Sequence, residues 1–369
     1  MTSSSLLVVL AAVVWLAFAN GANDNSKGVA TLIGAARLSR RAALRYAAVT
    51  TFLGSMAALA LARGLLARFG GKGILAPELI DTPAFPVAVA AAAAATVFLA
   101  TWLALPVSTT HALVGALAGV GVVSGTLHGG TLAAAFLGPL LLSPPLALGA
   151  TAIAYPALRR LRLALGVSHE SCVCLAVEPL PVDASGAVTS ASAALRVVHG
   201  ESERCAGYSG TVAGVSAQRL LDACHLATAG AVSFARGVND TPKIAALLLL
   251  AAPLGLAGGS PLLLVGLVMA VGGLLAARKV AATMSHGITS MNDGQAFTAN
   301  LATALMVLVA SRFGLPVSTT HVSVGALFGI GAVNGSARWK TIAAIVLSWV
   351  LVLPLSALLS AGIWLALAG

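Results

Sequence analysis

Long apolar stretches constrain this chain more than any other feature. Runs near or above the roughly 20 residues that a helix needs to cross a bilayer recur along the sequence. Hydrophobic residues make up 59% of the chain and charged residues 9%, whereas an ordinary soluble domain carries about 25% charged residues. Lipid offers no hydrogen-bond partner to the backbone, so such stretches must be helical. We predict an all-α integral membrane protein with about 10 to 12 transmembrane helices, broken helices counting as one or two.

The positive charge is spread in a way that fits a membrane protein and does not fit a nucleic-acid binder. The formal net charge is +10, but the basic residues cluster between apolar stretches, at residues 37–45 and again at 159–162. Cytoplasmic loops of membrane proteins carry such an excess of arginine and lysine. We therefore expect a multi-pass protein of the cell membrane, the inner or plasma membrane, with lipid as a partner and no nucleic acid.

A drop in hydropathy divides the chain into three parts. Residues 1–158 are predicted to form an N-terminal membrane repeat, 159–218 an extramembranous, cytoplasmic insert, and 219–369 a C-terminal membrane repeat. Alternating valines in the insert predict a few strands. The cysteines lie in or close to this polar region, but their Cys-x-Cys spacing differs from that of common zinc sites, so we expect unpaired thiols and no metal.

The chain is an internal duplication. The six letters Pro-Val-Ser-Thr-Thr-His stand at Pro106–His111 and again at Pro316–His321, each after an apolar run and before a small-residue run. Such a long identity within one chain indicates a repeat. Proline stops the preceding helix and leaves carbonyls unsatisfied, so we expect broken or re-entrant helices that line a protein-enclosed cavity.

A second motif accompanies each hexapeptide. Residues 21–27 and 237–243 both read Gly-x-Asn-Asp-x-x-Lys, and they precede their hexapeptides at nearly the same separation. If the insert and the basic loop at 37–45 both lie in the cytoplasm, the two halves enter the membrane with opposite orientation, as in inverted-repeat transporters. A parallel arrangement stays open.

Each hexapeptide supplies hydroxyl groups and a helix start at one place. A tetrahedral oxyanion is well held by hydroxyls and by the N–H groups at a helix N-terminus, where the helix dipole also favours negative charge. The two sets predicted to converge on one anion are Ser108, Thr109 and Thr110 in the first half and Ser318, Thr319 and Thr320 in the second.

The charged residues of the Asn-Asp motifs lie at the ends of apolar runs, where a charge is costly. One explanation is that Asp24 and Asp240 pair with Lys27 and Lys243, three residues on and on the same helix face. The other is that the carboxylates, together with Asn25, offer hard oxygen ligands to a coupling cation, either Na⁺ or H⁺. The two lysines then compensate the charge of the anion.

The two histidines that end the hexapeptides leave two roles open. Because an unperturbed imidazole titrates near physiological pH, a proton relay is one role for His111 and His321. A structural role is the alternative, in which each imidazole bonds to a backbone carbonyl and holds the broken helix.

These motifs resemble those of the PiT family of inorganic phosphate transporters, which carry Gly-Ala-Asn-Asp and Pro-Val-Ser-Thr-Thr-His in each half. Gly21–Asp24 and both hexapeptides match letter for letter, and the second copy has valine in place of alanine. The resemblance implies an inverted-repeat homodimer that moves phosphate by symport with sodium ions or protons, and it places Asn23 and Asn239 at the phosphate site. The chain differs from the family where Lys27 and Lys243 replace an asparagine, and a fixed ammonium there is able to replace a sodium ion.

Other functions remain as alternatives. A sulfate or other oxyanion permease of the same fold would use the same hydroxyls and helix starts. A membrane-embedded phosphotransferase is disfavoured because every polar element is duplicated, whereas catalytic groups occupy different environments. The chain has no Gly-x4-Gly-Lys-Ser/Thr nucleotide motif. We therefore expect a secondary transporter with no catalytic residues and no cofactor beyond the coupling ion.

Overall fold

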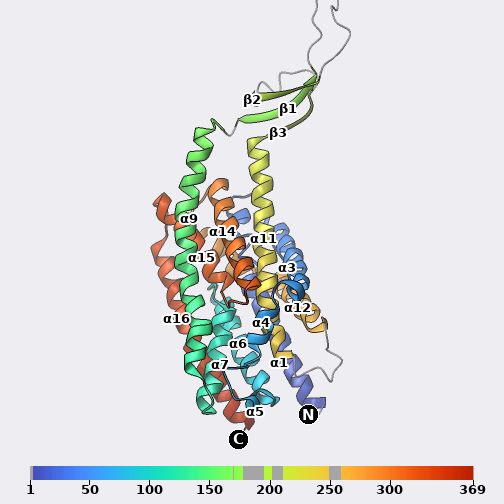
Figure 1. The fold of residues 1–369 in the computed structure, drawn as a ribbon, viewed down its shortest axis with the longest axis vertical. Helices are drawn as coiled ribbons and strands as arrows, with labels where there is room; N and C mark the ends of the chain where they lie inside the picture. Colours follow the sequence, from blue (N-terminus) through green and yellow to red (C-terminus); the bar gives the residue numbers. More distant parts are fainter. Residues whose placement is uncertain (1–2, 169, 178–194, 202–210, 249–258, 369) are drawn as a thin grey trace, which may run out of the picture.

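A computed structural model describes residues 3–168, 170–177, 195–201, 211–248 and 259–368. Helices form nearly all of it, and a small sheet stands at one end (Figure 1). The first half contains α1 (Ser3–Asp24), α2 (Ala30–Gly34), α3 (Arg40–Leu61), α4 (Arg63–Phe69), α5 (Pro77–Ile80), α6 (Ala84–Trp102), α7 (Thr109–Val123), α8 (Gly129–Leu132), the π-helix η1 (Ala133–Leu137) and α9 (Gly138–Ala164). The second half contains α11 (Ala217–Ala245), α12 (Ser260–Ala276), α13 (Arg278–His286), α14 (Asp293–Arg312), α15 (Thr319–Asn334) and α16 (Trp339–Ala368).

The all-α membrane fold is confirmed. Within the described ranges, 6 helices are long and apolar enough to cross a membrane, or 7 if α12 and α13, which meet at a bend of 74°, count as one span. The range expected from the sequence was higher because it included broken helices. These are present as α7 and α15, which are only 15 and 16 residues long. Leucine and isoleucine side chains on the outer faces of α9 and α16 are exposed, including Ile153 at 74% and Leu358 at 73%, as a lipid-facing surface requires.

Helices of the first half pack against helices of the second half in matching pairs. Helix α3 packs on α11 of the second half, and α12 packs on α1 of the first. In the same way α9 packs on α15, and α16 packs on α7. In Figure 1, α1 begins at the lower end, near the N-terminus, whereas α11 begins at the upper end, next to β3. The corresponding helices α1 and α11 therefore run in opposite directions, as they would in an inverted repeat.

Glycines after the hexapeptides allow helices of the two halves to pack closely. A Cβ on Gly115 of α7 would lie 2.3 Å from the carbonyl oxygen of Leu353 in α16. A Cβ on Gly325 of α15 would lie 2.5 Å from the carbonyl oxygen of Pro144 in α9. Glycine at these positions lets the helix backbones touch, which is how membrane helices gain close packing in the absence of a hydrophobic force between them.

The described part of the predicted insert contains the strands that the valine pattern indicated. Strands β1 (Ser171–Val177), β2 (Leu195–Glu201) and β3 (Thr211–Ser216) form an antiparallel sheet in the order β2-β1-β3, between the ends of α9 and α11. Cys174 and Cys224 are free thiols, as expected, but the prediction was wrong for Cys172, which is disulfide-bonded. Residues 169, 178–194 and 202–210 of the insert lie outside the described residues. The boundaries at 159 and 218 and the cytoplasmic side remain predictions.

Candidate functional site

Each Pro-Val-Ser-Thr-Thr-His motif ends a loop and begins a helix. Ser108 caps α7, because its Oγ accepts a hydrogen bond from the backbone N–H of His111 at 3.1 Å. Ser318 caps α15 in the same way, at 3.2 Å from the backbone N of His321. A serine cap satisfies one of the N–H groups at a helix start and leaves the others without an intrahelical partner. Both helix starts therefore favour a negative charge.

Asn23 holds the loop in front of α7. Its Nδ2 donates hydrogen bonds to Thr101 Oγ1 and to the carbonyl oxygen of Leu105, both at 3.0 Å. Its Oδ1 accepts a hydrogen bond from the backbone N–H of Val107, also at 3.0 Å. The end of α1 therefore positions the hexapeptide of its own half.

Asn239 has the corresponding role in front of α15. Its Nδ2 donates to the carbonyl oxygen of Val317 at 3.2 Å and to Asp240 Oδ1 at 2.9 Å. Its Oδ1 accepts a hydrogen bond from Ser311 Oγ at 3.1 Å. The amides of both asparagines that the family resemblance placed at the phosphate site are thus engaged with the loops that carry the hydroxyls.

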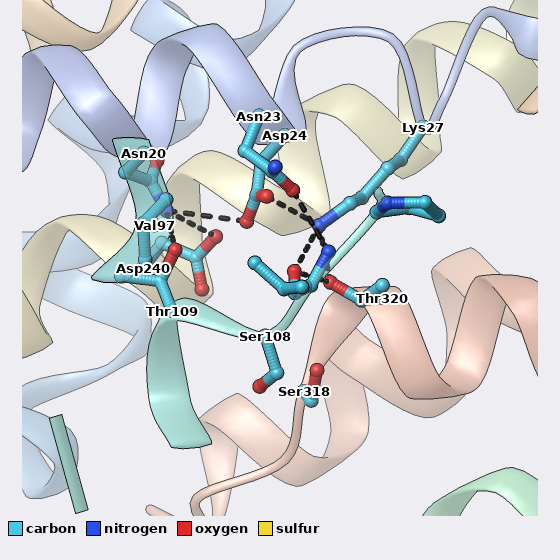
Figure 2. A network of polar contacts seen from close by, with 12 residues as sticks. Asn20, Asn23, Asp24, Lys27, Val97, Ser108, Thr109, Asp240, Ser318 and Thr320 are labelled. Atoms are coloured by element: carbon cyan, nitrogen blue, oxygen red, sulfur yellow. Dashed lines mark hydrogen bonds and ion pairs between the residues drawn. The ribbon is translucent and has the colours of Figure 1, made fainter. Parts of the chain in front are cut away.

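Lys27 connects the first half to the second. Its Nζ donates to the carboxylate of Asp24 and to the hydroxyl of Thr320, and it lies 3.0 Å from the carbonyl oxygen of Val107 (Figure 2). Thr320 in turn donates to the same carbonyl oxygen at 2.7 Å. The ammonium therefore occupies a site made of a carboxylate, a carbonyl and a hydroxyl oxygen.

Lys243 repeats this arrangement from the opposite side. Its Nζ donates to Asp240 Oδ1 at 3.4 Å, to the carbonyl oxygen of Val317 at 2.8 Å and to the hydroxyl of Thr110 at 2.7 Å. Each lysine thus binds the aspartate and the loop carbonyl of its own half and a threonine of the other half. The Asp–Lys pairing considered from the sequence is present, and it is part of a contact between the halves.

Asn20 joins the two aspartates, a role that the sequence analysis missed. Its Nδ2 lies 3.2 Å from Asp24 Oδ2, 3.4 Å from Asp240 Oδ2 and 3.0 Å from Thr109 Oγ1 (Figure 2). Asn20 and Asp24 are four residues apart and share one face of α1. A search for polar residues one helical turn before each Asn-Asp motif would have found it.

The same search would have found Arg236, which precedes Asp240 by four residues on α11. Arg236 is 1% exposed, and its charge interacts with those of Asp24 and Asp240. Within the described ranges, its Nε, Nη1 and Nη2 have no hydrogen-bond partner. Arginine is rarely buried without a paired group.

The rings of the two hexapeptide histidines are in contact and are tilted by 44° to each other. The ring centroids of His111 and His321 lie 4.4 Å apart, and that of His321 lies 3.9 Å from the Trp349 ring. His321 Nδ1 donates to the carbonyl oxygen of Leu140 at 3.2 Å, since a carbonyl only accepts. His111 Nδ1 and His321 Nε2 are buried without a partner among the described residues.

The two remaining predicted residues, Thr319 and Asn25, lie in different places. Thr319 is buried at the start of α15, at the position that Thr109 holds in the first repeat. Asn25 lies away from the lysine sites, between α3 and α12: its Nδ2 donates to the carbonyl oxygen of Leu44 at 3.1 Å, and its side chain contacts the site of Gly273. The fold thus gathers the hydroxyls, aspartates and lysines at one place and orients the Asn25 amide elsewhere.

Burial gives this network its electrostatic character. Asp24, Lys27, Asp240 and Lys243 are each 3% exposed or less. Charges in such surroundings interact far more strongly than in water and are costly without partners. The site therefore combines two carboxylates and three cationic side chains at the starts of two helices.

Comparison with known proteins identifies the family of this chain. A model of the phosphate transporter family matches residues 20–360. A candidate phosphate permease of Thermococcus kodakarensis is 28% identical over 397 residues, which cover 96% of both chains. The chloroplastic inorganic phosphate transporter 2-1 of Arabidopsis thaliana is 27% identical over 94% of this chain and 69% of its own length.

One solved structure has the same fold. A sodium-dependent phosphate transporter superposes with a TM-score of 0.77 at 22% identity and covers 99% of each chain. Together with the apolar helices, these matches identify a multi-pass membrane transporter and not an enzyme. The chain belongs to the phosphate transporter family.

Proposed function

We propose that this chain is a secondary active transporter that moves inorganic phosphate across the membrane by proton symport. The family supports phosphate as the substrate. The observation that carries the proposal is the meeting of two capped helix starts, α7 and α15, at one buried network with an excess of cationic groups. Such an environment suits a tetrahedral anion.

The anion would lie between the two hexapeptides. Ser108 and Ser318 accept hydrogen bonds as caps, and this leaves each hydroxyl hydrogen for donation. They lie on the same side of the network in Figure 2. Thr109 and Thr319 complete the hydroxyl set. The hydroxyl hydrogens of Thr110 and Thr320 are already donated to the carbonyl oxygens of Val317 and Val107, so these two threonines would bind the anion through their backbone N–H groups at the helix starts. In this proposal Asn23 and Asn239 act by holding the loops, and not by direct contact with phosphate.

The coupling ion is a proton in this proposal because the two lysines occupy the oxygen sites that a cation would use. The Nζ of Lys27 is bound by a carboxylate, a carbonyl and a hydroxyl oxygen, and Lys243 has the equivalent set. Hard oxygen ligands of this kind suit metal cations. Asp24 and Asp240 then neutralise tethered ammonium groups, and a sodium ion, as in the solved sodium-dependent transporter, is not required.

The histidine pair is the proposed proton carrier. Two imidazoles whose centroids lie 4.4 Å apart disfavour a second positive charge, so the pair would hold one proton at a time. His111 Nδ1 and His321 Nε2 are the nitrogens without a partner in the described chain, and they are therefore the expected proton sites.

Uptake of labelled phosphate into proteoliposomes tests the proposal. We expect saturable uptake driven by an inward proton gradient, little response to a sodium gradient, and weak competition by excess sulfate. Asp24→Asn and Asp240→Asn should abolish uptake, while Asp81→Asn, the same change at an exposed loop position, should not. Uptake driven by sodium alone would overturn the proton coupling. Equal competition by sulfate would change the substrate to a general oxyanion, and the absence of flux under every gradient would refute transport.

A homodimer and an inverted repeat are part of the same proposal. The opposite directions of α1 and α11 in Figure 1 support the inverted repeat. Light scattering on the detergent-purified protein, corrected for bound detergent, measures the oligomeric state, and a mass of one 36.5 kDa chain would refute the dimer.

A further inference from the structure

Arg236 is the buried group that the contacts described so far leave unused. It is the largest fully buried side chain in the described ranges. None of its guanidinium nitrogens has a hydrogen-bond partner there. A buried charge without a hydrogen-bonded partner is strongly unfavourable, and native proteins satisfy such groups with ligands, ions or water. The guanidinium therefore points to a ligand of opposite charge.

The helix places this guanidinium at the transport site. Arg236, Asp240 and Lys243 are spaced by four and three residues and share one face of α11. Asn20 and Asp24 at the end of α1 and Lys27 in the turn that follows have the same spacing in the sequence. The two repeats therefore match in their aspartate and lysine, and they differ at one position, where the first half has a neutral amide and the second a guanidinium.

The charges of the site show why Arg236 has no internal partner. The carboxylates of Asp24 and Asp240 already bind Lys27, Lys243 and Asn20. With all groups in their usual ionised forms, two carboxylates face three cationic side chains. One positive charge remains, and a singly charged anion would neutralise it.

We infer that Arg236 is the cationic ligand of the transported oxyanion, and that it makes the two repeats unequal in anion binding. A planar guanidinium donates two parallel N–H groups to two oxygens of a tetrahedral anion, a geometry that lysine does not offer. The hydroxyls and N–H groups of α7 and α15 bind the remaining oxygens. This inference rests on the proposed function, because it assigns a further residue to the same anion site.

Anion-induced thermal stabilisation of the purified protein tests this inference. Inorganic phosphate should raise the melting temperature of the wild type, and at the same concentration it should raise that of Arg236→Gln much less. Without phosphate, Arg236→Gln should melt at the same temperature as the wild type or higher, because a buried unpaired charge is removed. A residue with a merely structural role would give the opposite result, a lower melting temperature with the phosphate response retained.

Binding constants for phosphate give the magnitude. We expect the dissociation constant of Arg236→Gln to rise on the order of tenfold to a hundredfold, as for the loss of a charged hydrogen-bonding group. Arg236→Lys keeps the charge and should lie between. Arg312→Gln, the same change at an exposed position at the end of α14, is the matched control and should bind as the wild type does.

The outcomes separate this inference from the proposed function. If the wild type binds and transports phosphate and Arg236→Gln has the same dissociation constant, the inference fails and phosphate transport stands. If the wild type binds sulfate instead and Arg236→Gln loses that binding, the inference stands and the phosphate assignment fails. If neither anion binds the wild type, both fail. Arg236→Lys provides the comparison should Arg236→Gln not fold.

Discussion

The Nζ of Lys243 lies 2.7 Å from the hydroxyl of Thr110, across the boundary between the two halves of the chain. Lys27 makes the equivalent contact with Thr320 in the opposite direction. Each half therefore carries a lysine that binds the first turn of the other half's hexapeptide helix. The two helix starts are held in place by reciprocal charged contacts and not only by apolar packing.

Variants of Lys243 should separate the contribution of the Asp240–Lys243 pair to stability from its contribution to uptake. In Lys243→Met, Asp240 becomes a buried carboxylate without its cation, and we expect a loss of about 3–5 kcal/mol of stability together with the loss of uptake. Adding Asp240→Asn removes the unpaired charge and should restore most of the melting temperature without restoring uptake. Thermal unfolding and uptake measured on both variants check this. A single variant as stable as the wild type would show that the pair is not coupled.

Replacing both lysines by asparagine should change the response to cations. In Lys27→Asn with Lys243→Asn, the oxygen sites lose their tethered ammonium groups and become available to a free cation. We expect uptake by this variant to require sodium, whereas wild-type uptake does not. Initial rates in sodium and in choline buffers at one pH provide the measurement. A variant that is equally active in both buffers would argue against lysine as the occupant of a cation site.

The histidine pair should govern proton coupling and not phosphate recognition. His111→Gln and His321→Gln each remove one titratable group from this pair of contacting rings. We expect both variants to lose stimulation by an inward proton gradient and to retain phosphate counterflow. Because an inward gradient drives a proton symporter forward, wild-type uptake should rise as the external pH falls below the internal pH. Full stimulation in both variants would exclude the pair as the proton carrier.

Asn23 should act through the loop that it holds. Asn23→Ala leaves the N–H of Val107 and the carbonyl of Leu105 without their side-chain partner. We expect a loss on the order of 1–3 kcal/mol of stability for each buried group left unsatisfied and a weakened affinity for phosphate. Asn25→Ala removes an amide that contacts Leu44 instead, so it should lower stability while affinity stays nearly constant. Unfolding and phosphate titration of the two variants distinguish the roles.

The glycines of the Gly-x-Asn-Asp motifs should be intolerant of a methyl group. A Cβ on Gly21 would lie 2.0 Å from the carbonyl oxygen of Met269, and one on Gly237 would lie 2.1 Å from that of Thr51. We expect either alanine variant to lose about 1–3 kcal/mol of stability, because helix backbones must separate. Gly362→Ala is the matched control, since nothing lies within 4 Å of its added Cβ. Equal melting temperatures for all three variants would contradict this packing.

The sequence predicted the contacts of the site correctly where the interacting residues are only a few positions apart in the chain. Asp24 and Lys27 pair as their spacing predicts, and each serine caps the helix that its own hexapeptide begins. It was a poor guide to the direction of a side chain: Asn25 neighbours Asp24 in the chain, yet its amide contacts Leu44. Neighbouring residues on a helix or turn point to different sides, so adjacency does not imply a shared site.

The sequence by itself determined that the chain is a duplicated helical membrane protein of the phosphate transporter family, because apolar segment length and repeated motifs are local properties of the chain. Only the tertiary structure decided which repeat supplies each contact. Thr320 is 293 residues from Lys27, and Asn20 is 220 residues from Asp240. Such contacts depend on how whole helices pack, and for that reason the unpaired guanidinium of Arg236 became visible only in the folded chain.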